Sequence, residues 1–401
     1  MNQVKVYAVV SQFPIPLDRG DAVRTLQILQ ALNAQVELCV LSVLRADSKP
    51  EDISQLSELL EDAEIFTFAD ADVSRGSILK RLMRWTKSIA NQEPPWIFGR
   101  RSPEMKAHID SLPDNDSIFL AVSEATGTYI DSRKTWHWDK MNVLGESSKQ
   151  DIRFASGLSA RLRSRLLHQL CVKFEKRAIA NTGSISVTSD LELLRLQAAY
   201  DVTRHPIYVW PSCAPVAELK DERRNNTVRV VAWLGSLTYP SNIDGLVLFL
   251  ETAWTGIPDS KLRLKVIGRG LTRDREIELQ KSFPNVEFTG FVEDLADALT
   301  DVQAAVAPLW SGAGVKMKTL TLMGFGIPVF GTTVAFEGID VDDMNVTFDD
   351  PVQLFESIRD TSDEQLARLG AEMKRRIREY HSSENLKRSI IDTVTKLEHG
   401  I

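Results

Sequence analysis

Cysteine is scarce in this chain, which has three in 401 residues, Cys39, Cys171 and Cys213. Their odd number, wide separation and lack of ligand spacing exclude a disulfide framework and a cysteine-based zinc site, so we expect reduced thiols. The sequence also lacks HExxH, CxxC and a nucleophile elbow, which leaves zinc hydrolases and serine hydrolases without support.

Long apolar runs are missing as well. No stretch approaches the roughly 20 apolar residues that span a bilayer. The apolar segment 4–10 is too short for a secretory signal and is followed at once by Ser-Gln-Phe-Pro. We therefore expect a cytoplasmic protein, with any membrane contact peripheral.

Basic residues are fewer than acidic ones: the chain has 48 Lys and Arg and 55 Asp and Glu, which gives a net charge of −7. This balance argues against nucleic acid as a partner. The hydrophobic fraction of 43% is that of an ordinary globular protein. A chain of 401 residues exceeds what one core supports, so we expect two domains.

Segments of strand length and helical segments alternate along the chain with short connections. This alternation predicts parallel, doubly wound sheets. The expected strands are 4–10, 36–43, 65–68, 118–122, 141–144, 184–187, 228–235, 261–268, 286–290, 304–309, 327–331 and 345–348. The expected helices include 22–32, 153–180, 243–254, 295–299, 351–359, 363–380 and 384–398.

The segment HPIYVWPSCAPV (205–216) holds three prolines and no helical period. We place a linker at 206–216, between a Rossmann-like half at 1–205 and a second at 217–380.

Residues 304–331, AAVAPLWSGAGVKMKTLTLMGFGIPVFG, are the most informative stretch. Between two apolar strands lie Gly312, Gly314, Lys316 and Lys318. Glycines let the backbone approach a ligand, N–H groups at a helix start point toward it, and lysines add full charge. The stretch predicts a diphosphate site; the alternative is a surface turn with solvated lysines.

Other loops follow predicted strands, where ligands of open α/β sheets bind. Residues 235–242, GSLTYPSN, suit a phosphate or sugar contact; the alternative is a plain turn in which Asn242 caps a helix. After the strand 327–331, Thr332, Thr333 and Glu337 offer hydroxyls and a carboxylate to sugar or ribose hydroxyls. Glu337 could equally be an ordinary surface residue.

In the first half, the loop with Asp18, Arg19 and Gly20 either holds an acceptor or only turns the chain. The run Gly268-Arg269-Gly270 lacks the third glycine of a dinucleotide fingerprint, because position 273 is Arg. A nicotinamide site is therefore not expected.

Residues 75–101 are locally basic, with Glu93 as the one acid. Ile78, Leu82, Trp85 and Ile89 lie at helical spacing. Such a helix suits an anionic membrane surface or a lipid-phosphate acceptor. The alternative is a packed helix with a solvated basic face.

Together these motifs resemble the donor half of retaining nucleotide-sugar glycosyltransferases of group 1 (glycosyltransferase family 4). The matching residues are Pro308-Leu309, Gly312-Ala313-Gly314, Lys316, Lys318, Gly326-Ile327-Pro328-Val329, Thr332, Thr333 and Glu337-Gly338-Ile339. Residues 234–242 are similar to the GSM-x-Y-x-PN start of exopolysaccharide sugar transferases, and 290–294 match G-x-V-x-D. Weaker similarity covers 145–149 and 174–177.

The resemblance implies a GT-B fold, with two Rossmann-like domains facing across a cleft and a C-terminal helix, 381–401, packing back on the first domain. It assigns the acceptor to domain 1–205 and the donor, a UDP- or GDP-sugar, to domain 217–380, with no other cofactor and no metal. The implied catalytic residues are Lys316, Lys318 and Glu337. The implied donor-binding residues are Gly235, Ser236, Arg269, Gly312, Ala313, Gly314, Thr321 and Gly338, and those of the acceptor side are Asp18, Arg19, Gly20 and Glu146.

One departure concerns the two glutamates that the family places eight residues apart, the second of which binds the ribose. Those positions are Ala313 and Thr321 here. The Thr321 hydroxyl can still contact a ribose, although a neutral hydrogen bond is weaker than a charge-assisted one. Glu337 is the candidate substitute.

We expect a glycosyltransferase that moves a hexose-type sugar from a nucleotide donor to a glycan, lipid-linked or other small acceptor in polysaccharide or glycoconjugate biosynthesis. The resemblance implies retention and metal independence. The alternatives are a catalytically silent nucleotide- or sugar-binding subunit of the same fold, and a GT-B sugar-nucleotide epimerase.

Overall fold

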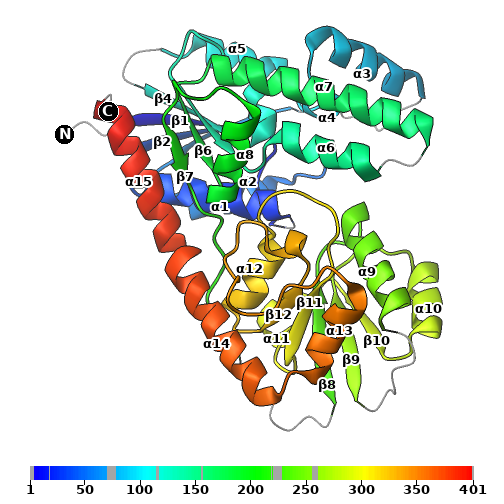
Figure 1. The fold of residues 1–401 in the computed structure, drawn as a ribbon. Coiled ribbons are helices and arrows are strands. Elements are labelled where there is room, and N and C mark those ends of the chain that lie inside the picture. Colours follow the sequence, from blue (N-terminus) through cyan, green and yellow to red (C-terminus); the bar gives the residue numbers. More distant parts are fainter. Residues whose placement is uncertain are drawn as a thin grey trace. The chain divides into compact units, whose positions relative to one another are not determined.

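The computed structural model describes residues 4–17, 19–69, 78–113, 117–154, 157–217, 219, 228–254 and 261–399. The chain divides into two compact units (Figure 1). Unit 1 comprises Met1–Pro211 and Leu386–Ile401, and unit 2 comprises Ser212–Asn385.

Unit 1 is built on a parallel sheet in the order β3-β2-β1-β4-β5-β6-β7. Its strands are β1 (Lys5–Val10), β2 (Glu37–Val43), β3 (Glu64–Phe68), β4 (Ser117–Val122), β5 (Trp136–Lys140), β6 (Ser184–Val187) and β7 (Ile207–Val209). Its helices are α1 (Gly20–Asn33), α2 (Pro50–Leu59), α3 (Ile78–Asn91), α4 (Pro95–Phe98), α5 (Pro103–Ser111), η1 (Glu124–Thr128), α6 (Leu144–Phe154), α7 (Leu158–Ala180), α8 (Asp190–Ala199) and most of α15 (Ser383–His399).

Unit 2 repeats the plan with a parallel sheet in the order β10-β9-β8-β11-β12. Its strands are β8 (Arg229–Leu234), β9 (Leu262–Ile267), β10 (Val286–Gly290), β11 (Ala304–Ala307) and β12 (Val329–Gly331). Its helices are α9 (Pro240–Thr252), α10 (Arg273–Ser282), α11 (Leu295–Ala298), α12 (Met317–Gly324), η3 (Thr333–Phe336), α13 (Pro351–Asp360) and α14 (Asp363–Tyr380). The strand order reverses between β8 and β11, where ligands of such sheets bind.

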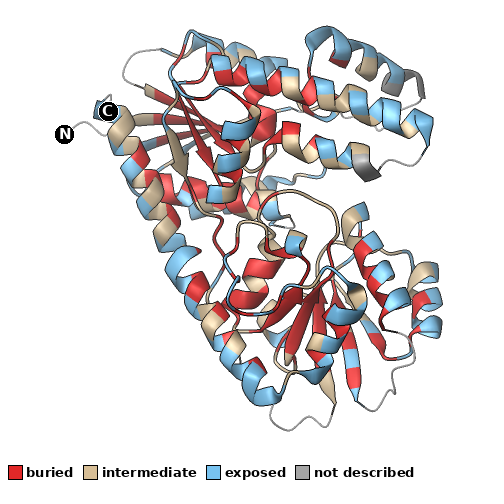
Figure 2. Cartoon of the chain, in the orientation of Figure 1, coloured by how far each residue is buried: buried red, intermediate tan, exposed pale blue. Residues whose placement is uncertain are grey.

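The central strands of both sheets are buried on their two faces, as expected for parallel strands flanked by helices (Figure 2). Val231, Ala232 and Trp233 of β8 are fully buried, as are Val9 of β1 and Phe119 of β4. The prediction of two doubly wound parallel sheets is confirmed.

Two of the predicted strands are wrong. Instead of 141–144, the strand is β5, Trp136–Lys140, and α6 begins at Leu144. The residues 345–348 contribute only a single bridge, from Thr347 to Gly331. The position of β5 could not be predicted from its sequence, WHWDK, because the strand contains charged residues, which normally lie at a protein surface.

Those charges are buried in ion pairs. Arg24 of α1 donates from Nη2 to Asp139 Oδ1 at 2.8 Å, and neither side chain is more than 2% exposed. The same guanidinium donates to the carbonyls of Trp210 and Pro211. The predicted linker segment, 206–216, therefore begins as the edge strand β7 and is held to α1.

A second buried pair joins Lys140 to Glu175 of α7. Glu175 also accepts hydrogen bonds from the backbone N–H groups of Leu144 and Gly145 at 2.9 and 2.7 Å, and from the Tyr200 hydroxyl. One carboxylate thus neutralises a buried lysine and caps the start of α6.

The replacement Glu175→Ala is expected to lower the free energy of unfolding by about 3–5 kcal/mol, because it leaves the Lys140 charge buried without its partner. Urea denaturation followed by circular dichroism measures the change. Lys176→Ala, at the exposed neighbouring position, is the matched control. Equal stability of the two variants would contradict this role of Glu175.

Candidate functional site

The loop from β8 to α9 begins at Gly235, whose φ of +156° suits glycine. A Cβ there would lie 3.3 Å from both Asn242 Nδ2 and Lys318 Nζ. Helix α9 starts at Pro240 with Tyr239 as its N-cap residue. The interpretation of Asn242 as the cap is therefore wrong, and its side chain is available to link neighbouring loops.

The glycine loop runs from the end of β11 to the start of α12. Gly312 and Gly314 have φ values of +117° and +74°, in the left-handed region. Helix α9 packs closely against this loop, since a Cβ on Gly245 would lie 2.1 Å from the Pro308 carbonyl oxygen. The loop is thus held against the β8–α9 segment at the carboxyl edge of the sheet.

Lys318, in the first turn of α12, reaches across to the β8–α9 segment. Its Nζ donates to Asn242 Oδ1 at 2.7 Å and lies 5.1 Å from the centre of the Trp233 ring. Asn242 in turn donates from Nδ2 to the Ser236 carbonyl at 2.7 Å. Burial, and then the charge of Lys316, lower the pKa of Lys318 to about 7.

Lys316 is held by a carboxylate instead. Its Nζ donates to the Gly314 carbonyl at 2.6 Å and lies 3.3 Å from Glu337 Oε2. The two side chains are 11% and 10% exposed. Glu337 follows η3 and precedes Gly338, whose φ is +73°. The structure therefore brings Lys316, Lys318 and Glu337 to one edge of the sheet.

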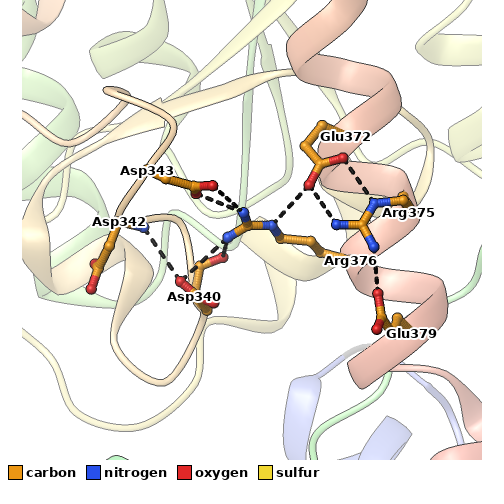
Figure 3. Close-up of polar contacts among 7 residues, drawn as sticks. All are labelled: Asp340, Asp342, Asp343, Glu372, Arg375, Arg376 and Glu379. Carbon is orange, nitrogen blue, oxygen red and sulfur yellow. Dashed lines mark hydrogen bonds and ion pairs between the residues drawn. The ribbon is translucent and has the colours of Figure 1, made fainter.

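The segment after Gly338 is anchored by Arg376 of α14 (Figure 3). The guanidinium donates to both carboxylate oxygens of Asp343 at 2.6 and 2.7 Å and to the Asp340 carbonyl at 3.0 Å. Glu372 on the same helix accepts from Arg376 Nε at 3.2 Å. This network fixes the exit of the chain from the Glu337 turn.

The other residues that the sequence predicted for the donor side lie in or near the loops at the same edge. The Ser236 hydroxyl is 2.8 Å from that of Thr238. Arg269 is exposed, with its guanidinium carbon 5.5 Å from the centre of the Phe291 ring. Ala313 and Thr321 are partly buried.

Of the residues that the sequence predicted for the acceptor side, Asp18 lies outside the described residues. Arg19 is the N-cap residue of α1 and donates to Gln12 Oε1 at 2.6 Å, while Gly20 opens the helix. Glu146, in the first turn of α6, pairs with Lys149.

Sequence reasoning missed the Asn242 and Trp233 contacts of Lys318. It also missed Asp349, which accepts from the Thr333 N–H and hydroxyl at 2.8 Å each. The asparagine was within the GSLTYPSN motif, but its spacing alone did not show which loop it joins.

Within the described ranges, no cluster of three or more His, Cys, Asp or Glu side chains could hold a metal ion. In the same part of the chain, no helix has both the length and the apolarity to cross a membrane.

Two tandem Rossmann-like units, with lysines gathered at the switch point of the second, are the architecture of GT-B glycosyltransferases. Residues 228–364 match the family model described as Glycosyl transferases group 1. The match identifies this segment as a group 1 glycosyltransferase domain and the protein as an enzyme of the glycosyltransferase class, which confirms the resemblance.

Solved structures support the fold across the whole chain. HepE from Anabaena, in complex with UDP and glucose, has a TM-score of 0.65 at 13% identity, covering 98% of this chain and 100% of its own. WaaG, a glycosyltransferase involved in lipopolysaccharide biosynthesis, has a TM-score of 0.62 at 14% identity and covers 96% and 98%.

TarM from S. aureus, in a complex that includes UDP and alpha-GlcNAc-glycerol, has a TM-score of 0.61 at 11% identity and covers 97% and 99%. At such identities the likeness shows the fold alone. A search of curated protein sequences gave no significant match.

The replacement Lys318→Met is expected to stabilise the protein near pH 7 by about 1–2 kcal/mol, because it removes a poorly solvated charge. The unfolded chain binds the Lys318 proton with the ordinary pKa of 10.5, whereas the folded chain releases it above about 7. The unfolded state therefore binds more protons between these values, so the stability cost of Lys318 shrinks as pH rises through this window.

Urea denaturation at about pH 7 and about pH 9.5 measures this dependence. Lys281→Met, at an exposed position at the end of α10, is the control and should show no gain at either pH. A gain for Lys318→Met that did not depend on pH would contradict the burial of an amine.

Proposed function

We propose that the protein transfers a sugar from a UDP- or GDP-sugar to a glycan or lipid-linked acceptor, with retention of configuration and without a metal ion. The observation that carries the proposal is the convergence of Lys316 and Lys318 with the Gly312–Gly314 loop at the switch point of unit 2. The complexes of HepE with UDP and UDP-glucose make UDP-glucose the first donor to test.

In this proposal the two amines and the glycine backbone bind the diphosphate. Breaking the bond to the sugar places negative charge on the departing phosphate, and preorganised cations stabilise that charge most when water is excluded. The limited exposure of Lys316 fits this requirement. The acceptor side is assigned to unit 1, with Arg19, Gly20 and Glu146 among its residues.

Glu337 has two roles in the proposal. Its carboxylate holds Lys316, and it is also the candidate acceptor for a hydroxyl of the donor ribose or sugar. This second role compensates for Thr321, which stands where the family places a glutamate. Thr321 and the Gly338 backbone complete the polar lining.

The replacement Lys316→Ala is expected to weaken UDP-glucose binding by about 1.5–3 kcal/mol, roughly 10- to 150-fold, the usual range for a hydrogen bond to a charged group. Isothermal titration calorimetry measures it, after a thermal-shift panel of uracil, guanine and adenine nucleotide sugars has identified the donor. Lys281→Ala is the control.

Failure of all three nucleotide classes to bind would overturn the donor site. Unchanged donor affinity in Glu337→Ala would remove Glu337 as a contact of the donor. Thr321 motivates the alternative of a catalytically silent binding subunit, and hydrolysis of the bound donor by the purified protein would exclude that alternative.

We further propose that unit 1 contacts an anionic membrane surface at the cytoplasmic side, through α3 and the first half of α7. Figure 1 shows the two helices side by side, and the Arg163 guanidinium lies 5.9 Å from the centre of the Trp85 ring. Their outer surfaces are largely exposed (Figure 2). The side chains of 78–81 lie outside the described residues.

The exposed surface of these helices combines large apolar side chains with cations. The exposed apolar residues are Leu82, Met83, Ile89, Leu158 and Leu162, and the exposed cations are Lys87, Arg161, Arg163 and Arg165. Neither α3 nor residues 158–174 contain an acid, in a chain of net charge −7. Apolar insertion together with attraction to anionic lipid is how interfacial helices bind.

The replacement Leu162→Glu is expected to lower binding to vesicles containing about 30 mol% anionic lipid by about 10-fold, because it removes insertion and adds repulsion. Co-sedimentation measures it. Leu194→Glu is the matched control, since both leucines are 63% exposed and Leu194 lies on α8. Equal binding to neutral vesicles, or equal loss in the two variants, would contradict this surface.

A further inference from the structure

Glu337 is the C-cap residue of the short helix η3, whose two ends are held by different parts of unit 2. At the start of η3, Asp349 accepts hydrogen bonds from the N–H and the hydroxyl of Thr333 at 2.8 Å each. At its end, Glu337 is followed at once by Gly338, whose φ of +73° and missing side chain give the backbone wide freedom. The place of the Glu337 carboxylate therefore depends on what holds the chain after Gly338.

Arg376 of α14 holds that segment (Figure 3). Its Nη1 donates to the carbonyl of Asp340, three residues after Glu337, at 3.0 Å. Its Nη2 donates to both carboxylate oxygens of Asp343 at 2.6 and 2.7 Å. The side chain of Arg376 is only 11% exposed, whereas that of Asp343 is 71% exposed. The arginine is thus the buried member of the pair, and the surface segment 340–343 is held to it.

Helix α14 is itself packed tightly against the elements that carry the rest of the site. A Cβ on Gly370 would lie 2.2 Å from the carbonyl oxygen of Gly326, which follows the end of α12. The Met373 sulfur accepts from the N–H of Val329 on β12 at 3.3 Å. One helix therefore contacts both the α12–β12 connection and the segment that follows Glu337.

We infer that Arg376 is a positioning residue of the donor site, which holds Glu337 where its carboxylate pairs with Lys316 and accepts from a hydroxyl of the donor. The inference rests on the proposed function. The hydrogen bonds of Arg376 are to the segment 340–343 and to Glu372 of its own helix, so it acts through Glu337 and not by contact with the donor.

Packing of apolar side chains does not replace this arginine. Ile339 and Val341, on either side of Asp340, are buried in the core of unit 2. Apolar burial is non-directional, whereas a planar guanidinium that donates two or more hydrogen bonds also fixes orientation. Binding groups need to be held to within about 0.5 Å by such supporting hydrogen bonds. Arg376 supplies the orientation that burial of its neighbours leaves open.

Arg375 is a matched control at the adjacent position (Figure 3). Its guanidinium bonds to Glu372 and Glu379, both on α14, and its side chain is 56% exposed. Arg375→Gln removes the same charge from the same turn of the helix and leaves the segment 340–343 held. A general electrostatic effect on an anionic donor would appear in Arg375→Gln and Arg376→Gln alike.

Isothermal titration calorimetry of UDP-glucose measures the effect, and GDP-mannose replaces it if UDP-glucose does not bind. Arg376→Gln is expected to weaken binding about 3- to 20-fold, as is usual for residues that act on a site without contact. The stoichiometry should stay at the wild-type value, because a variant that merely unfolds in part binds less donor with unchanged affinity. Arg376→Lys should also lose affinity, since an ammonium group cannot form the bidentate bond. Arg375→Gln should bind as the wild type does.

A second variant and a double-mutant cycle test the route of the effect. Asp343→Ala changes an exposed residue, so the protein should fold even where Arg376 variants do not, and it should weaken binding in the same direction. If Arg376 acts through Glu337, the double variant Arg376→Gln/Glu337→Ala should bind as weakly as Glu337→Ala alone. Titration with UDP locates the hydroxyl: a loss for UDP and UDP-glucose alike assigns the ribose, and a loss for UDP-glucose alone assigns the sugar. Either result supports the inference.

Wild-type affinity in Arg376→Gln and Asp343→Ala, or an equal loss in Arg375→Gln, would overturn the inference and leave the proposed function intact. Losses that multiply in the double variant would do the same, because they would show that Arg376 acts independently of Glu337. Failure of both nucleotide sugars to bind to the wild-type protein would overturn the donor site and this inference with it.

Discussion

The candidate site depends on how closely the backbones approach at the carboxyl edge of the unit 2 sheet. A Cβ on Gly268 would lie 1.8 Å from the Gly235 carbonyl oxygen, and one on Gly245 would lie 2.1 Å from that of Pro308. Only glycine permits such contacts. They draw the loops after β8, β9 and β11 together, and this proximity lets a side chain at the start of α9 hold one at the start of α12.

The buried cations of unit 1 and Lys318 of unit 2 have different kinds of partner. In unit 1, Arg24 and Lys140 are buried against Asp139 and Glu175, and each guanidinium or amine has its carboxylate. Such pairs contribute little net stability, but breaking one is costly, so they fix which segments meet. In unit 2, the partly buried Lys318 lies beside an amide and an aromatic ring. A charge that lacks a carboxylate in the unliganded protein is stabilised by an anionic ligand.

Periodicity and loop chemistry predicted most of the fold. The apolar strands on either side of the glycine loop stand out because a parallel sheet buries both faces of a strand. The prediction of an anion site came from glycines and lysines at fixed spacing. The strand β5 was not predictable in this way, because His137, Asp139 and Lys140 are polar residues whose partners come from α1, β6 and α7. Pairings between distant segments leave no local period.

Contacts between distant segments were equally unpredictable at the candidate site. Lys316 and Lys318 were found from their loop, but their different surroundings depend on Glu337 and Asn242, 21 and 76 positions away in the sequence. The sequence therefore predicted that two amines face a ligand. It could not predict that one is paired with a carboxylate and the other with an amide.

The lack of a carboxylate partner for Lys318 is connected with Thr321, which stands where the family that the sequence resembles has a glutamate. Position 321 lies three residues after Lys318 on α12, a spacing at which helical side chains are neighbours. A glutamate there would neutralise the amine and favour its charged form. Threonine provides no such carboxylate. The pKa of Lys318, which burial and the charge of Lys316 lower, is therefore not raised again by a neighbouring carboxylate on this helical face.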